Sequence, residues 1–220
     1  MFFECSSLKN IEPLGSWNVS NGINFKYMFC NCSSLLNIKP LENWDISNGN
    51  NLEGIFSRCT ELSDISPLEK WKVSKCTNFS FIFHMCISLV NIKPLQNWNV
   101  SNGHNFQSLF SECDSLVDIT PLKGWNVSNG TLFKLMFHDC PKLSDITPLQ
   151  NWKVSKGTNF ENMFSDCQSL SNLKPLEDWN VSNGENFYKM FWINSSNEID
   201  KNPLKKWKLP EKTFESMFYQ

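Results

Sequence analysis

The hydrophobic positions of this 220-residue chain repeat every 27 residues, and the pattern inside one repeat predicts its local structure. The apolar residues between positions 25 and 32 are spaced i, i+3, i+4 and i+7, which is typical of one face of a short helix. Pro40 blocks further helix, and Trp44 and Ile46 then alternate with polar residues, as in a short strand. The Ser-Asn-Gly sequence at 47–49 predicts a turn, because Asn and Gly tolerate positive φ. Each repeat is therefore expected to contain a short strand, a turn and a short helix.

Cysteine, tryptophan, proline and phenylalanine all recur at this interval, the cysteines for example from Cys5 to Cys167. A unit of 27 residues cannot bury its apolar face alone, so it must stack on its neighbours. We therefore predict an α/β solenoid of about eight 27-residue units that forms a single domain over residues 1–220. The last unit, about 192–220, has lost the cysteine and is a candidate C-terminal cap.

Stacking would turn each repeated position into a ladder of identical side chains. We expect buried, reduced cysteine thiols, tryptophan rings that pack on one another, and buried asparagine amides that satisfy turn carbonyls. The structural ladder residues are Cys32, Cys59, Cys86, Cys113 and Cys140; Trp44, Trp71, Trp98, Trp125 and Trp152; and Asn51, Asn78 and Asn105. Leu132 interrupts the asparagine ladder.

The sequence Met-Phe-x-x-Cys-x-x-Leu-x-x-Ile at 28–38, with its copies every 27 residues, resembles the BspA-like leucine-rich repeats, and more closely the surface-protein repeat family DUF285. The resemblance covers nearly the whole chain and implies a leucine-rich-repeat-like, right-handed superhelix. Members occur on the surfaces of bacteria, in some protists and in large DNA viruses, and the resemblance implies binding or adhesion to other proteins, with no known catalysis. The Ile-x-Pro-Leu at 38–41 departs from the family, which usually has a plain L-x-L strand there.

Composition narrows the function classes further. The net charge of −2 gives no basic field for nucleic acid, and no apolar run approaches the roughly 18 residues that a membrane span needs, so we expect no nucleic-acid partner and no membrane insertion. The N-terminus, Met-Phe-Phe-Glu-Cys, lacks the pattern of a signal peptide. The localisation stays open, and only the family resemblance favours a role at a surface or virion, in host interaction.

No residue pattern indicates an enzyme, a metal or a cofactor. His84 and His138 share a repeat position but are two units apart, which is too far for one ion, and Cys30 with Cys32 has no second ligand pair nearby. No serine, histidine and acid cluster is signalled. We therefore expect no catalytic, metal-binding or cofactor-binding residues.

Function is then expected where the copies of the repeat differ from one another, since solenoids commonly bind proteins through a variable face. The candidate partner-binding residues are Lys39, Lys93, Thr120, Lys174, Phe81, Met85, Tyr188 and Trp192. The preferred interpretation is a non-catalytic scaffold for protein–protein interaction, of the surface, host-interaction or adhesion type. The alternative is a structural solenoid that assembles end to end, because the chain starts in the middle of a unit: either it is a piece of a longer repeat protein, or its open first coil docks onto another copy or partner.

Overall fold

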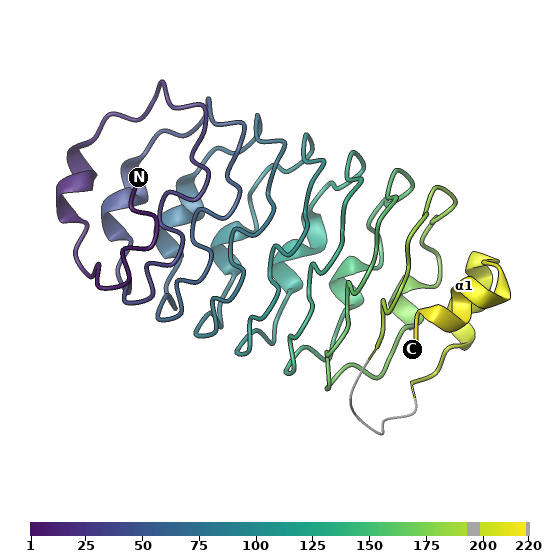
Figure 1. Ribbon diagram of the computed structural model, residues 1–220. Coiled ribbons are helices and arrows are strands. Elements are labelled where there is room, and N and C mark those ends of the chain that lie inside the picture. Colours follow the sequence, from purple (N-terminus) through teal and green to yellow (C-terminus); the bar gives the residue numbers. More distant parts are fainter. Residues whose placement is uncertain (193–198, 219–220) are drawn as a thin grey trace.

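The computed structural model describes residues 1–192 and 199–218 as a stack of coils, one for each repeat, with the two termini at opposite ends of the stack (Figure 1). Nearly every coil carries one short 3-10 helix, and these helices line up along the stack. We name each coil by its 3-10 helix. The elements are η1 (Glu12–Ser16), η2 (Lys39–Asn43), η3 (Ser66–Lys70), η4 (Lys93–Leu95), η5 (Thr120–Gly124), η6 (Thr147–Leu149), η7 (Lys174–Leu176), η8 (Asn202–Trp207) and the α-helix α1 (Glu211–Ser216).

The predicted strand-turn-helix unit is wrong. Residues 25–32 form overlapping turns in which alternate N–H groups leave the coil: Phe25 N–H donates to Asn51 O of the next coil at 2.9 Å, whereas Met28 N–H closes a turn onto Phe25 O at 3.3 Å. Tyr27 and its counterparts at 27-residue intervals as far as Lys189 have positive φ, which a continuing right-handed helix does not allow. The chain of turns still points the apolar residues inward, so it reproduces helical spacing without a helix.

The predicted strand is also absent: among the described residues the structure has no strand or sheet, only isolated parallel bridges such as Asn51 with Asn78. Each coil instead places Pro40 or its equivalent in the first turn of a 3-10 helix, where proline's missing N–H breaks no helical hydrogen bond. The α/β solenoid is therefore replaced by stacked coils of turns and 3-10 helices.

Asparagine and aspartate side chains form the corners of each coil. In the η2 coil, Asn37 Oδ1 accepts from Lys39 N–H at 2.8 Å and Asp45 Oδ1 accepts from Ser47 N–H at 3.0 Å. Such Asx turns fix a change of direction without secondary structure. The corners recur in most other coils, so the sequence repeat is largely a repeat of corner positions.

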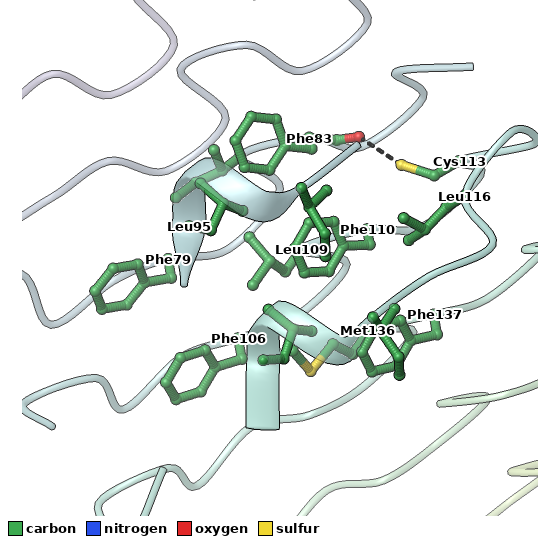
Figure 2. Close-up of a cluster of buried hydrophobic side chains, with 14 of the residues drawn as sticks. Phe79, Phe83, Leu95, Phe106, Leu109, Phe110, Cys113, Leu116, Met136 and Phe137 are labelled. Carbon is green, nitrogen blue, oxygen red and sulfur yellow. Dashed lines mark hydrogen bonds between the residues drawn. The ribbon is translucent and has the colours of Figure 1, made fainter. Parts of the chain in front are cut away.

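The core is a stack of aromatic rings that runs through every coil. The rings from Phe2 to Phe218 at 27-residue intervals stack with centroid separations of 5.5–6.2 Å. A second stack, from Phe79 to Phe187, has separations of 5.3–5.7 Å. Figure 2 shows three rings of the first stack and two of the second in neighbouring coils. An α-helix about 10–12 Å in diameter does not fit coils at this spacing.

The stack continues into the last unit, where Phe218 stacks on Phe191 at 5.5 Å and Trp207 on Trp179 at 6.4 Å. The α-helix α1 lies at this end of the stack (Figure 1). Residues 193–198 and 219–220 of the unit predicted as a cap lie outside the described residues. None of the described helices is long and apolar enough to span a membrane.

Candidate functional site

The cysteine and tryptophan ladder residues lie in the core. Each buried ladder thiol donates to a phenylalanine carbonyl of the preceding coil, as Cys113 Sγ does to Phe83 O at 3.1 Å (Figure 2). Burial raises the pKa of the Cys86 thiol to about 12, so it is protonated and unreactive at neutral pH. Each buried ladder tryptophan donates its indole N–H to a leucine carbonyl, as Trp125 does to Leu95 O at 3.0 Å. Both ladders tie one coil to the next and leave no polar group for a ligand.

The asparagine ladder differs in detail from its prediction. Asn51, Asn78 and Asn105 are half-buried, and their side-chain oxygens accept from the backbone N–H two residues later, at 2.9–3.1 Å, where donation to turn carbonyls was expected. Leu132 has no side-chain acceptor for this bond, although its backbone forms the same bridges with the neighbouring coils. These residues are third corners of the coil.

We call residues 25–32 and their equivalents in the other coils the turn segment. Of the candidate binding residues in it, Tyr188 is the most exposed, at 45%. Phe81, Met85 and Trp192 are half-buried. The Phe81 and His84 rings form a T-shaped contact with their centroids 5.7 Å apart, and Lys189 Nζ lies 4.9 Å from the Trp192 ring centroid. These aromatic side chains are already engaged within the protein and do not form one exposed apolar anchor.

A hydrogen-bonded line of Ser57, His84 and Glu112 crosses three coils, which sequence reasoning missed. His84 Nε2 lies 3.2 Å from Glu112 Oε1, and Nδ1 lies 3.1 Å from Ser57 Oγ. A carboxylate only accepts, so Nε2 carries the proton and Ser57 donates to Nδ1. Burial lowers the pKa of His84, with Arg58 and His138 acting in the same direction and Glu112 opposing them. The serine is 5% exposed, which leaves its oxygen little access to a substrate.

His138, at the repeat position of His84, contacts its serine with the hydrogen bond in the opposite direction. Ser165 Oγ donates to Asn162 O at 3.1 Å, so the 2.7 Å contact between His138 Nδ1 and Ser165 Oγ requires the histidine to donate. Its Nδ1 lies 3.7 Å from Asp166 Oδ2. No group of three or more His, Cys, Asp or Glu side chains suited to a metal ion occurs within residues 1–192 and 199–218.

The candidates at the start of the 3-10 helices are all exposed: Lys39, Lys93, Thr120 and Lys174 are the first residues of η2, η4, η5 and η7. We call the surface formed by the exposed residues of η1 to η7 the lateral face. Lys39 is paired with Glu42, and Lys174 is paired with Glu177. Lys93 and Thr120 instead line a groove.

This groove lies between the η4 and η5 coils and has a volume of about 690 Å³, within the range of ligand pockets. Asn91, Lys93 and Gln96 line it from one coil. Thr120 and Lys123 line it from the next, together with Asp118 and Gly124. A Cβ added at Gly124 would meet no atom within 4 Å, so the groove is open there. Lys93 and Thr120 were predicted from the variability of their repeat position, whereas the groove was not predicted.

Comparison with known proteins agrees with the repeat pattern. The family described as "Mycoplasma protein of unknown function, DUF285" matches three overlapping stretches, residues 1–119, 59–170 and 119–220, which together span the chain. No protein with a curated description matches the sequence. The chain therefore belongs to the DUF285 family.

Proposed function

We propose that this chain is a non-catalytic repeat scaffold that binds another protein through its lateral face. The observation that supports this function is the contrast between neighbouring positions of the 3-10 helices. The leucine that follows the proline is buried and identical in every coil from Leu14 to Leu176. The next position is exposed or half-buried and reads Gly, Glu, Glu, Gln, Lys, Gln, Glu in successive coils.

Physical constraint explains the leucines, because a core close-packed at crystal density tolerates little change in volume. Core packing does not explain why the side chain at the next position varies among the coils, since a side chain in solvent is not required to have any particular charge. A series of different side chains held at fixed intervals on a rigid stack is the arrangement by which repeat proteins recognise protein partners. The resemblance to surface-protein repeats extends the proposal to adhesion or host interaction.

Peptide selection tests the proposal and does not require an identified partner. Peptides selected from a random display library on the wild-type chain should lose binding to a variant with Lys93→Ala and Lys123→Ala on the lateral face. They should keep binding to a charge-matched control with Lys75→Ala and Lys156→Ala, two exposed lysines outside the 3-10 helices. Selected peptides that tolerate the first variant and lose binding to the second would contradict the proposal.

End-to-end association is the second candidate, supported by the apolar surface of the first coil. Met1 and Phe3 are 78% and 52% exposed, and Trp17 is 40% exposed, whereas its counterpart Trp44 is 4% exposed. Light scattering over a hundredfold concentration range tests this candidate. A mass that rises with concentration in the wild type, and stays at 25.5 kDa in a Phe3→Lys variant, would favour assembly over partner binding.

A further inference from the structure

A glutamate bridges two lysines of neighbouring coils near each end of the lateral face. Glu42 pairs with Lys39 of its own coil and with Lys70 of the next, at 2.9 Å. These two lysines lower the pKa of Glu42 to about 2, so the carboxylate stays charged. Near the other end, Glu177 pairs in the same way with Lys174 and Lys206. The fold therefore uses one carboxylate between two ammonium groups as a recurring arrangement.

The middle of the face also has two lysines from neighbouring coils but lacks the carboxylate. Lys93 occupies the repeat position of Lys39 and Gln96 that of Glu42, whereas the lysine of the next coil, Lys123, stands one residue before the position of Lys70, at the repeat position of Glu69. Neither Lys93 nor Lys123 has an acidic side chain within ion-pair distance in the part of the chain that the structure describes.

The groove between the η4 and η5 coils provides the space for an external carboxylate. Both Lys93 and Lys123 line it, and Gly124 replaces the side chain that Lys70 places at this position two coils earlier. Asp118 is the one acid among the described lining residues, and its Oδ1 already accepts from Thr120 N–H at 2.8 Å. The two ammonium groups therefore outweigh the single carboxylate.

We propose that this groove binds a glutamate or aspartate side chain from an acidic segment of a partner protein, in the place that Glu42 and Glu177 occupy in their own coils. The inference rests on the proposed protein-binding function and names the chemistry of the partner. Gln96 and Asn97 supply amide donors and acceptors along the groove, and Asn91 supplies an amide donor while its Oδ1 accepts from Lys93 N–H at 2.9 Å; these groups suit a peptide backbone. The net charge of −2 and the absence of arginine from the described lining disfavour a nucleic acid.

Fluorescence anisotropy with labelled hexaglutamate tests the proposal, with hexaglutamine as the neutral probe. The wild type should bind hexaglutamate and not hexaglutamine, and binding should weaken at 0.5 M salt because the lysines are exposed. Gln96→Glu restores the internal carboxylate and should weaken binding at least fivefold. Asn43→Asp adds the same charge on the lateral face in the η2 coil, two coils from Lys93 and three from Lys123, and should change binding less than twofold.

A gain of binding provides the converse experiment. Glu42→Gln leaves Lys39 and Lys70 without their shared carboxylate and should add a second hexaglutamate site per chain. Circular dichroism checks that each variant remains folded, since all three substituted side chains lie at the surface.

Absence of hexaglutamate binding, equal weakening by Gln96→Glu and Asn43→Asp, or binding of heparin oligosaccharide in place of hexaglutamate would each overturn the proposal. The scaffold function is tested separately by the selected peptides. If they bind the lateral face while hexaglutamate does not, the carboxylate site fails and the scaffold function stands.

Discussion

Truncation of Trp125 tests how the coils are held together. Its side chain is 4% exposed, its ring lies 6.5 Å from that of Phe106, and its indole N–H donates to Leu95 O of the preceding coil. Trp125→Ala removes the ring and should lower the free energy of unfolding by about 3–5 kcal/mol. Trp125→Phe keeps most of the ring but removes one of the two hydrogen bonds that Leu95 O accepts, since Trp98 N–H still donates to it at 3.0 Å, and this loss should cost about 0.5–1.5 kcal/mol.

Trp17→Phe is the matched control, because the indole N–H of Trp17 has no acceptor among the described residues. Its effect on the free energy of unfolding should stay below about 0.5 kcal/mol, as for a surface substitution that breaks no such contact. Urea unfolding followed by circular dichroism gives all three values by linear extrapolation. A loss below about 1 kcal/mol for Trp125→Ala, or equal losses for the two Trp→Phe variants, would refute the assigned contacts.

Four other substitutions or reactions test separate parts of the structure. Leu132→Asn supplies the missing acceptor for Lys134 N–H and should raise the urea midpoint by the equivalent of about 1 kcal/mol or less; a lower midpoint would contradict the corner assignment. Burial lowers the pKa of His84, so the unfolded chain binds a proton more readily, and the free energy of unfolding should fall as the pH drops through about 6.5. His84→Gln should flatten this part of the pH profile of the free energy of unfolding, and an unchanged profile would exclude His84 as its source. Cys5 is exposed and the other eight thiols are buried, so Ellman's reagent should react rapidly with one thiol in the folded protein and with nine after denaturation; several fast thiols would contradict the buried ladder. If the line through Ser57 is structural, Ser57→Ala should hydrolyse p-nitrophenyl acetate at the wild-type rate, and a loss of rate would indicate catalysis.

The repeat and the identity of the core residues followed from the sequence, because burial imposes the same side chain at the same place in every coil. The local structure did not follow. Apolar residues at i, i+3, i+4 and i+7 face one side of a helix, but they also face one side of a chain of turns with two positive-φ residues four positions apart. Gly54, Asn31 and Asp139 occupy such positions, and residues of these types tolerate positive φ better than most. Tyr27, Phe81, Leu135, Arg58 and Met85 occupy the same positions in other coils, so the residue types there gave no consistent signal against a helix.

The candidate site was only partly predictable for a similar reason. Variation between repeats identified Lys93 and Thr120 as exposed positions, and exposure follows from the repeat. The groove depends on Gly124, which leaves space that its counterparts fill, and on Gln96, which removes a carboxylate. The contact between Ser57 and His84 joins residues 27 positions apart whose alignment becomes visible only when coils are stacked in register.

Backbone amide chemical shifts, mapped while hexaglutamate is added to the isotope-labelled chain, test the carboxylate-binding groove residue by residue. We expect shifts confined to the lateral face of the η4 and η5 coils, largest at Lys93, Gln96, Lys123 and Gly124, with the phenylalanine stacks unaffected. Shifts centred on the turn segment around Phe81 or on the first coil, or the absence of shifts at concentrations where the peptide binds, would contradict the proposal.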